Sequence, residues 1–380
     1  MRIVLTGGGT GGHFYPAVAV ADRLREVARA ERLIEPELYF LAPDPYDAGT
    51  LFDHGIKYRR ILAGKTRRYF SPLNIVDWVK VVLGAIGTLW TMYKLYPDVV
   101  FSKGGYGAFP VVFAARVLRI PVVMHESDSK PGRVNAWTAR FAERIAVSYP
   151  SAAEQFPAEI KSKVAWTGNP VRSTIARRAP EGAREYLKLE EHTPTLLVLG
   201  GSQGAQAINR IIIESLKDLT ADYQIIHQTG KANFEEARSA GGFELEGTGR
   251  ERRYLPFPYL DDLALRMSAG AADLVVTRAG SSLFEVASWG LPAIVIPIPE
   301  AVAHDQRENA YAYARSGSAV VLEEPNLTRG VFVAEVRRVM DSEPLRRQMS
   351  AAAVTFNKPD ADLAIAKEIL AIGLLHEPEV

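Results

Sequence analysis

A run of glycines that ends in a histidine lies close to the start of the chain, at Gly7-Gly8-Gly9-Thr10-Gly11-Gly12-His13. Glycine lets a ligand come close to the backbone, and free N–H groups at the start of a helix attract phosphate or another anion. His13 closes the loop, where its side chain could face a bound substrate; a surface imidazole that caps the turn is an equal alternative. We therefore expect an anion-binding loop that ends in a histidine.

A second glycine-rich run, Gly200-Gly201-Ser202-Gln203-Gly204-Ala205, repeats this arrangement in the middle of the chain. Each run follows a short apolar segment, 2–6 or 195–199, whose β-branched residues predict a buried strand. Helical spacing of apolar residues follows, from Pro16, which suits a first helical turn, to Val27, and again over 209–216. The sequence therefore predicts the unit of strand, glycine loop and helix twice.

The first loop also matches the dinucleotide fingerprint G-x-G-x-x-G, but this match is weak because most of its positions are glycine. A nicotinamide-binding domain should carry an acidic residue about twenty positions further on, at the end of the second strand. The expected second strand, around residues 37–42, ends in alanine and proline instead. A nicotinamide-dependent dehydrogenase is therefore disfavoured.

Further apolar strands alternate with helical stretches, which is typical of a parallel, doubly wound sheet. Turn residues at 166–172 separate two such series. We predict an α/β protein of two Rossmann-like, doubly wound domains joined near residue 172. Ligands in such sheets lie beyond the carboxyl ends of the strands, so two facing edges would form a cleft. The remaining predicted strands are 38–41, 99–102, 122–125, 145–148, 224–228, 274–277 and 293–296.

The composition excludes several classes of function. The 380 residues are 47% hydrophobic and carry a formal net charge of +1, which does not favour nucleic-acid binding. The chain has no cysteine and so no disulfide, thiol nucleophile or thiolate metal site. The first residues do not resemble a secretory signal, and the apolar stretch 81–90 is too short to span a bilayer. We therefore expect a cytoplasmic protein.

Seven short motifs occur in the order found in the MurG family of bacterial glycosyltransferases, which the chain resembles from residue 1 to about residue 325. Two of them are the glycine runs at 8–13 and 200–205. Seven motifs in order are far more specific than any single one. The others are Ser102-Lys103-Gly104-Gly105-Tyr106, His125-Glu126, Thr167-Gly168-Asn169-Pro170-Val171-Arg172, Arg278-Ala279-Gly280 and Gln306-x-x-Asn309-Ala310.

The resemblance implies the GT-B architecture of two Rossmann-like domains. Residues 1–172 would bind the acceptor and the membrane, and 173–350 would bind the donor, UDP-GlcNAc. Residues 351–380 would form a helical segment that packs back on the N-terminal domain. The implied reaction moves N-acetylglucosamine to the C4 hydroxyl of the muramoyl sugar of undecaprenyl-linked lipid I, inverts the anomeric centre and yields lipid II for peptidoglycan. Other cell-wall synthesis proteins are candidate partners.

Such a displacement needs a base near the attacking hydroxyl and stabilisation of the departing diphosphate. His13 is the leading candidate for the base, and Glu126 is the rival base or an acceptor-binding carboxylate. The alternative for Glu126 is an ion pair with a nearby arginine. Gly104, Gly105 and Tyr106 are assigned to the acceptor side, although Tyr106 could equally serve loop packing.

The donor site implied by the resemblance draws on both halves of the chain. Ser202 and nearby amides would meet the diphosphate, and Arg172 would bind the same oxygens or act as a structural clamp. Glu285 would bind the ribose, while Gln306 would bind the sugar or lie exposed at a helix start. The full donor set is Thr10, Gly11, Gly12, Asp128, Arg172, Ser202, Gln203, Leu260, Ser281, Ser282, Leu283, Phe284, Glu285 and Gln306.

At two of these donor positions, the residue type itself argues for another role or puts the implied role in doubt. Leu260 falls where the family has an apolar residue against uracil, whereas the residue alone suggests core packing. Asp128 stands where the family commonly has asparagine, and a carboxylate cannot donate a hydrogen bond unless it is protonated. GT-A transferases bind a divalent cation through an Asp-x-Asp pair, and the sequence contains this pattern only at Asp360-x-Asp362. That pair follows a proline at a predicted helix start, where N-capping explains it better, so we expect no metal and no cofactor.

A lipid acceptor implies contact with the cytoplasmic leaflet of the membrane. Tryptophans, aliphatic residues and bases gather over residues 74–94, a pattern typical of an interfacial helix, and a core-facing helix is the alternative. The apolar stripe is Ile75, Trp78, Val79, Val82, Leu83, Ile86, Leu89, Trp90 and Tyr93, and the bases are Lys65, Arg67, Arg68, Lys80 and Lys94.

Two other classes of function stay open. A different GT-B enzyme that glycosylates a lipid, such as a diacylglycerol glycosyltransferase, would share the donor domain but not the loops that hold His13 and Tyr106. A non-catalytic nucleotide-sugar binding protein would tolerate loss of His13 and Glu126.

Overall fold

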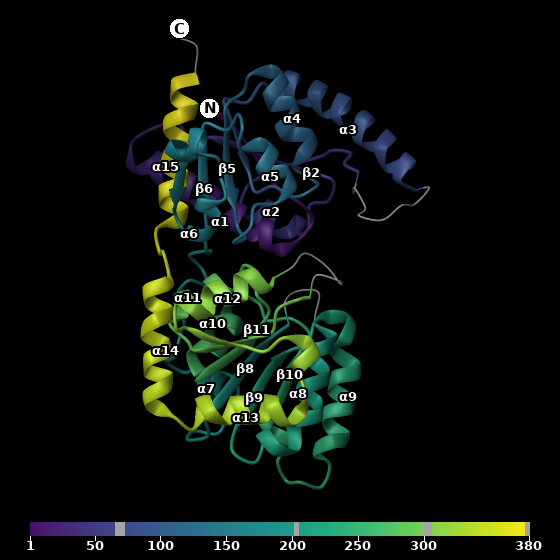
Figure 1. The fold of residues 1–380 in the computed structure, drawn as a ribbon, viewed down its shortest axis with the longest axis vertical. Coiled ribbons are helices and arrows are strands. Elements are labelled where there is room, and N and C mark those ends of the chain that lie inside the picture. Colours follow the sequence, from purple (N-terminus) through teal and green to yellow (C-terminus); the bar gives the residue numbers. More distant parts are fainter. Residues whose placement is uncertain (65–72, 201–204, 300–305, 377–380) are drawn as a thin grey trace. The chain divides into compact units, whose positions relative to one another are not determined.

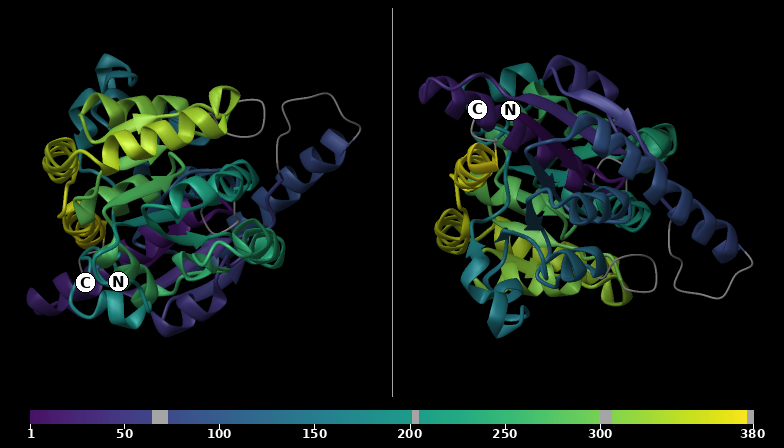
Figure 2. Two further views of the ribbon diagram at one scale, coloured as in Figure 1. Left: turned by 90° about the horizontal axis from the view of Figure 1, so that it is seen from below. Right: turned by 90° about the horizontal axis from the view of Figure 1, so that it is seen from above.

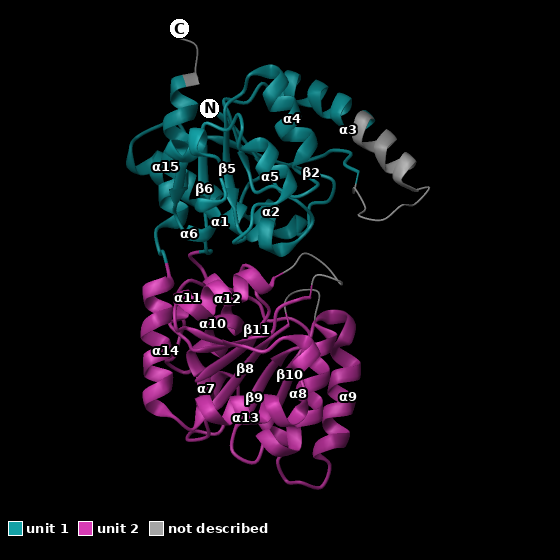
Figure 3. Ribbon diagram, in the orientation of Figure 1, with its two compact units in different colours: residues 1–172, 358–380 teal, residues 173–357 magenta. Residues whose placement is uncertain are grey.

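The structure, a computed structural model, describes residues 1–64, 73–200, 205–299 and 306–376, with the side chains of 73–82 and 376 left out. The chain forms two compact units (Figures 1 and 3). Unit 1 contains Met1–Arg172 and the segment from Lys358 onwards, and unit 2 contains Ser173–Asn357. The chain therefore passes between the units twice, once after Arg172 and once after Asn357.

Unit 1 is built on a sheet whose described strands follow the order β3-β2-β1-β4-β5-β6-β7, with every neighbouring pair parallel. The chain order reverses beside β1, so the loops after the strands meet at one edge, where ligands of such sheets bind. The strands are β1 (Arg2–Thr6), β2 (Glu37–Ala42), β3 (Lys57–Arg60), β4 (Val99–Ser102), β5 (Val122–Glu126), β6 (Arg144–Val147) and β7 (Val164–Trp166).

Helices cover both faces of this sheet, which explains why its central strands are almost wholly apolar. Ile3 of β1 points to the face covered by α1 and α15, while the adjacent Val4 points to the face covered by α3 and α4. Figures 1 and 2 show α3 along the side of the unit, next to α4. The helices are α1 (Gly11–Ala30), α2 (Ala48–Asp53), α3 (Leu73–Leu95), α4 (Phe109–Leu118), α5 (Arg133–Thr138), α6 (Pro150–Glu154) and α15 (Ala361–His376).

Unit 2 repeats the plan with the parallel order β10-β9-β8-β11-β12-β13. Its strands are β8 (Thr195–Leu199), β9 (Gln224–Gln228), β10 (Tyr254–Phe257), β11 (Leu274–Thr277), β12 (Ala293–Val295) and β13 (Ala319–Val321). Its helices are α7 (Ala183–Tyr186), α8 (Gln206–Leu219), α9 (Phe234–Leu245), α10 (Asp262–Ala271), α11 (Ser282–Trp289), α12 (Arg307–Arg315), α13 (Arg329–Met340) and α14 (Glu343–Phe356).

The two strand orders are equivalent, so β8 corresponds to β1, β11 to β4 and β12 to β5. The prediction of two Rossmann-like parallel sheets is therefore confirmed. The four strands that the sequence did not predict are β3, β7, β10 and β13, which lie at the sheet edges.

Two details differ from the expectations. Helix α1 begins at Gly11 rather than at Pro16, because Thr10 takes the extended N-cap conformation and leaves Pro16 inside the helix. The expected break at residue 350 falls within α14, which stays in unit 2 because Phe356 stacks on Phe284 and packs against Tyr313. Within the described segment that begins at Lys358, helix α15 packs against α1 of unit 1.

Candidate functional site

The first glycine loop runs from Gly7 to Thr10 and places His13 in the first turn of α1. The Thr10 carbonyl accepts hydrogen bonds from the backbone N–H groups of His13 and Phe14, each at 3.1 Å. The His13 Nδ1 lies 2.8 Å from the carbonyl oxygen of Gly8. Because a carbonyl oxygen only accepts, Nδ1 carries the proton, and the lone pair of the neutral ring is on Nε2. The tautomer is the one that a base acting through Nε2 requires.

A second loop, which follows β4, packs directly on the first. Gly104 and Gly105 adopt left-handed conformations, with φ of +76° and +78°. An ideal Cβ on Gly105 would lie 3.0 Å from Cε1 of His13 and 3.0 Å from Cα of Gly8, so only glycine fits there without displacement. The hydroxyl of Tyr106 lies beside Gly9, 3.0 Å from where its Cβ would be. The structure therefore brings together His13 and the three residues assigned to the acceptor.

Glu126 ends β5 and holds the loop that follows it. One of its carboxyl oxygens accepts from the backbone N–H of Asp128 at 3.0 Å. The other accepts from the N–H of Gly132 and from Nδ2 of Asn135, both at 2.9 Å. Burial raises the pKa of Glu126 to about 7, and the negative charge of Asp128 acts in the same direction. These partners are amides rather than an arginine, and they favour a role in shaping the loop over a role as the base.

Lys103 and His125 form a buried polar cluster behind these loops, and the sequence motifs contained both without assigning them a role. The Lys103 ammonium, 1% exposed, donates to Nδ1 of His125 at 2.5 Å, to Oγ of Ser127 at 2.6 Å and to Oδ1 of Asn169 at 3.3 Å. On its other side, Nε2 of His125 donates to the Gly168 carbonyl at 3.0 Å. The ring of His125 thus has the opposite tautomer to that of His13.

Burial is the main influence on the titration of both cluster members. It lowers the pKa of Lys103 to about 7, although the carboxylates of Glu126 and Asp128 act to raise it. It also lowers the pKa of His125 well below its ordinary value, and the charge of Lys103 adds to this effect. The polar residues at the ends of β4 and β5 are visible in the sequence, but they do not show that Lys103 is buried among them.

Arg172, the last residue before the chain enters unit 2, stacks on an aromatic group at the start of α1. Its guanidinium lies 4.2 Å from the ring centroid of Tyr15, and that ring contacts both Phe14 and Tyr46 edge to face. A guanidinium keeps its charge while it stacks. The contact therefore suits the structural clamp and leaves the predicted diphosphate contact as a proposal.

In unit 2 the predicted donor residues gather after β11 and β12. The side-chain oxygen of Gln306 accepts from the backbone N–H groups of Ala279 and Ile298, at 3.2 and 3.4 Å, and so joins the two loops. Its Nε2 faces Gly280, where an added Cβ would lie 3.4 Å away. Ser281, Ser282 and Glu285 lie half-buried in the adjacent start of α11. Ser202 and Gln203 fall outside the described residues.

Three predicted donor residues direct their side chains inward instead. Leu283 is 0% exposed and Phe284 3% exposed, because the helical turn of α11 points them into the interior. Their amides donate to the carbonyls of Gly280 and Ser281 within the turn. Their side chains therefore pack in the interior, and the assignment of Leu283 and Phe284 to the donor stays a prediction. Leu260 is 2% exposed, which agrees with the core-packing alternative, and its N–H donates to Gln228 at 3.0 Å.

Arg278 follows β11 and braces the ends of the next two strands. Its Nη1 donates to the Ile296 carbonyl at 3.0 Å, after β12, and pairs with Glu324 at 2.6 Å, after β13. Of the Asp360-x-Asp362 pair, Asp362 lies in the first turn of α15 and binds Arg23 at 3.0 Å. Both arrangements are explained by contacts within the protein.

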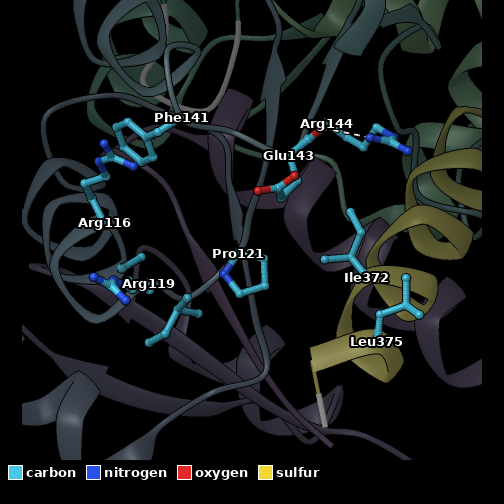
Figure 4. Close-up of a pocket in the computed structure, with 10 residues that line it drawn as sticks. Arg116, Arg119, Pro121, Phe141, Glu143, Arg144, Ile372 and Leu375 are labelled. Carbon is cyan, nitrogen blue, oxygen red and sulfur yellow. Dashed lines mark hydrogen bonds between the residues drawn. The ribbon is translucent and has the colours of Figure 1, made fainter. Parts of the chain in front are cut away.

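A cavity of about 460 Å³ lies in unit 1 among Arg116, Arg119, Pro121, Phe141 and Arg144 (Figure 4), with Ala115, Ile120, Glu143, Ile372 and Leu375 completing its lining. Ile120 and Pro121 lead into β5, and Glu143 leads into β6. These are the amino ends of the strands, whereas the loops around His13 follow the carboxyl ends. The cavity therefore does not belong to the candidate site.

Comparison with known proteins defines the class. Residues 3–147 match the glycosyltransferase family 28 N-terminal domain, and residues 195–365 match the glycosyltransferase family 28 C-terminal domain. The chain therefore belongs to glycosyltransferase family 28, and the two parallel-sheet units are those of a GT-B glycosyltransferase.

Its relatives are more specific. A protein of Treponema denticola named UDP-N-acetylglucosamine–N-acetylmuramyl-(pentapeptide) pyrophosphoryl-undecaprenol N-acetylglucosamine transferase is 35% identical, with 94% of each chain covered. A protein of the same name from Shouchella clausii is 37% identical over 89% of this chain and 90% of the relative. The crystal structure of Acinetobacter baumannii MurG matches with a TM-score of 0.72 and 26% identity, covering 97% of this chain and 99% of that one.

Proposed function

We propose that this chain transfers N-acetylglucosamine from UDP-GlcNAc to the C4 hydroxyl of the muramoyl sugar of lipid I, which gives lipid II. The observation that carries this proposal is the pair of interlocked glycine loops: Gly105 packs against the ring of His13, whose Nδ1 binds the Gly8 carbonyl, and Tyr106 packs against Gly9. Relatives that carry the name of this transferase along nearly their full length support it.

The proposed reaction is a single displacement. His13 Nε2 takes the proton of the C4 hydroxyl as its oxygen forms the new bond to C1 of N-acetylglucosamine. The bond from C1 to the diphosphate oxygen breaks with its electron pair, and UDP leaves from the opposite face, so the anomeric centre inverts. Glu126 acts by holding the loop of Asp128 and Asn135 through its hydrogen bonds.

The donor is assigned to the strand ends of unit 2. Gln306 would donate from Nε2 to the sugar while its oxygen holds the loops after β11 and β12. Glu285, in the first turn of α11, would accept from the ribose hydroxyls. Loop amides and Arg172 would stabilise the departing diphosphate, which gains negative charge in the transition state.

Helix α3 is the proposed membrane contact. Leu83, Ile86, Trp90 and Tyr93 form one exposed stripe, between 55% and 62% exposed, and Lys94 lies 4.8 Å over the ring of Trp90. Leu89, which the sequence placed in the same stripe, instead packs on the core, as does the buried Met92. The remaining members of the predicted stripe and four of its bases lie outside the described side chains.

The ammonium of Lys94, over the ring of Trp90, is a positive charge within this stripe, and a basic group beside a tryptophan supports binding to an anionic leaflet. Of the described helices, none combines the length and the apolar character needed to cross a bilayer. We infer a peripheral protein on the cytoplasmic face.

The first test is transfer of radiolabelled N-acetylglucosamine from UDP-GlcNAc to lipid I, with a chelator present. Wild type should form lipid II, and His13→Ala should lose about 10²- to 10⁴-fold in kcat, the range for loss of a general base. If the variant keeps its rate, the base lies elsewhere. If wild type glycosylates diacylglycerol instead, or binds UDP-GlcNAc without transferring it, the acceptor assignment is wrong.

The membrane contact is tested by co-sedimentation with vesicles that contain anionic phospholipid. Trp90→Glu should reduce the bound fraction several-fold, because it places a charge in the exposed stripe. Phe243→Glu is the matched control, since Phe243 is 76% exposed and belongs to unit 2 rather than to α3. Equal binding of the two variants would contradict the assignment of α3.

A further inference from the structure

We propose that Lys103 is a positioning residue of the transfer reaction, whose buried ammonium group fixes the loop of Gly105 and Tyr106 and, through that loop, the place of His13. This inference rests on the proposed function, because the reaction it serves is transfer to lipid I.

The first argument is the number of separate segments that Lys103 joins. Its three acceptors come from two places in the chain: His125 and Ser127 at the end of β5, and Asn169 beyond β7. An ammonium has three N–H donors, so each acceptor receives one of them. Its own backbone N–H donates to the Thr6 carbonyl at 2.8 Å, at the end of β1. One residue thus connects the ends of several strands.

The second argument is the position of Lys103 under both loops. An ideal Cβ on Gly7 would lie 3.3 Å from the Cβ of Lys103, so the stem of the lysine lies directly against the first loop. Gly104 and Gly105 follow in left-handed conformations, and Gly105 packs on the backbone of Gly8 and on the ring of His13. Because Gly105 touches both the first loop and the imidazole, a shift of Lys103 is passed through Gly105 to His13.

The third argument concerns charge. The acceptors of Lys103 are uncharged, while the titratable groups around the cluster are His125, the carboxylates of Glu126 and Asp128, and His13. A neutral amine would have two N–H donors for three acceptors. Burial lowers the pKa of Lys103 to about 7, so loss of its proton at alkaline pH should loosen the cluster. Transfer by wild type should then fall on the alkaline side, with Lys103 contributing to that limb.

The experiment compares Lys103→Met, which keeps an unbranched apolar stem and removes the ammonium donors, with Lys57→Met at an exposed lysine of unit 1. We measure kcat and the UDP-GlcNAc KM of transfer against pH, the thermal midpoint, and the ring ¹⁵N spectrum of the seven histidines. Lys103→Met should lose about 100-fold in kcat, the effect of a misplaced reacting group, with donor KM within two-fold and a weaker alkaline limb. The rings of His13 and His125 should shift, and Lys57→Met should match wild type.

Two outcomes would overturn the proposal. One is a Lys103→Met protein with a wild-type kcat and pH profile. The other is a kcat loss without any change in the His13 ring signal or in the pH profile, which would indicate a merely structural lysine. If Lys103→Met does not fold, Ser127→Ala removes a single acceptor and should lower kcat by about three- to ten-fold with the same changes in the histidine spectrum; an unchanged spectrum would again contradict the role.

The proposed function can fail separately. If wild type does not act on lipid I, the transfer assignment is wrong. The coupling between Lys103 and the ring of His13 is then still decided by the histidine spectrum, which needs no substrate.

Discussion

Each unit carries a basic residue directly after an equivalent strand, β4 beside β1 in unit 1 and β11 beside β8 in unit 2. The two basic residues have different surroundings. Lys103, after β4, donates to uncharged acceptors. Arg278, at the equivalent position after β11, pairs with Glu324 at 2.6 Å. Both residues brace the ends of neighbouring strands, so the topology and the mechanical role are shared.

The difference lies in where the compensating charge is placed. Arg278 has its counter-charge in direct contact, so its brace is close to neutral. The carboxylates of Glu126 and Asp128 act on Lys103 through space and raise its pKa. Glu126 ends β5, and Asp128 lies in the loop that follows and borders the candidate site. Equivalent positions in two similar sheets can therefore serve stability in one unit and the electrostatics of a reaction site in the other.

The strongest test of this comparison uses Gly105 and Gly280, which lie three residues after the equivalent strands β4 and β11. Gly105→Ala places a Cβ 3.0 Å from Cε1 of His13, at a φ of +78° that alanine adopts only with strain, so kcat should fall about 100-fold. Among the described residues, the Cβ of Gly280→Ala meets only Nε2 of Gln306, at 3.4 Å, so this variant should change the transfer rate less than about three-fold. Steady-state transfer assays on both variants check this, and equal losses would remove the distinction between the units.

The second test concerns stability. Arg278→Met leaves the carboxylate of Glu324 without its positive partner. Because the two side chains are 12% and 23% exposed, the variant should lose about 2–3 kcal/mol of unfolding free energy, less than a fully buried pair would. Lys103→Met leaves only neutral acceptors unpaired, which should cost about 1–2 kcal/mol. Urea unfolding of both variants measures the difference. A larger loss for Lys103→Met would show that its charge is paired more tightly than the contacts indicate.

The third and smallest effect is the pH dependence of stability. The pKa of Glu126 is raised by burial from 4.5 to about 7, so its contribution is full below pH 4.5 and is lost as the pH rises through 7. The pKa of His227 in unit 2 is lowered by burial from 6.5 to about 3, so its contribution is present above pH 6.5 and is lost as the pH falls through 3.

Between pH 4.5 and 6.5 the two contributions therefore change in opposite directions. The stability of wild type relative to Glu126→Gln should fall with rising pH, and that relative to His227→Asn should rise, each by at most about 1.4 kcal/mol per pH unit. Urea midpoints at several pH values provide the measurement. Parallel trends for the two variants would contradict the assigned burial effects.

The sequence predicted the central strands of both sheets because strands covered on two faces are continuous apolar runs, as in 195–199. The edge strands escaped prediction for physical reasons: Lys57–Arg60 is mostly exposed and basic, and Tyr254–Phe257 contains a proline. An edge strand is held by pairing on one side, and its own residues give little sign of it.

The candidate site divides in the same way. Loops made of glycine and placed between a strand and a helix could be recognised from sequence, which gave His13 and the turn at Gly104 and Gly105. The role of Lys103 could not, because nothing in its neighbours says that a lysine after a strand is buried among acceptors from residues 125–169. The inward turn of Leu283 and Phe284 likewise depends on where α11 begins.

The return of the chain to unit 1 also has a consequence for synthesis on the ribosome. Unit 2 is one continuous stretch, Ser173–Asn357, and can complete its core as soon as that stretch has emerged. Unit 1 is made first, but the side of α1 that packs against Ile369 and Leu370 of α15 has no cover until the last helix follows. N-terminal domains usually finish folding first, but here unit 2 can complete its core before unit 1 does. The unit that carries His13 keeps an uncovered apolar face on α1 until α15 has been made.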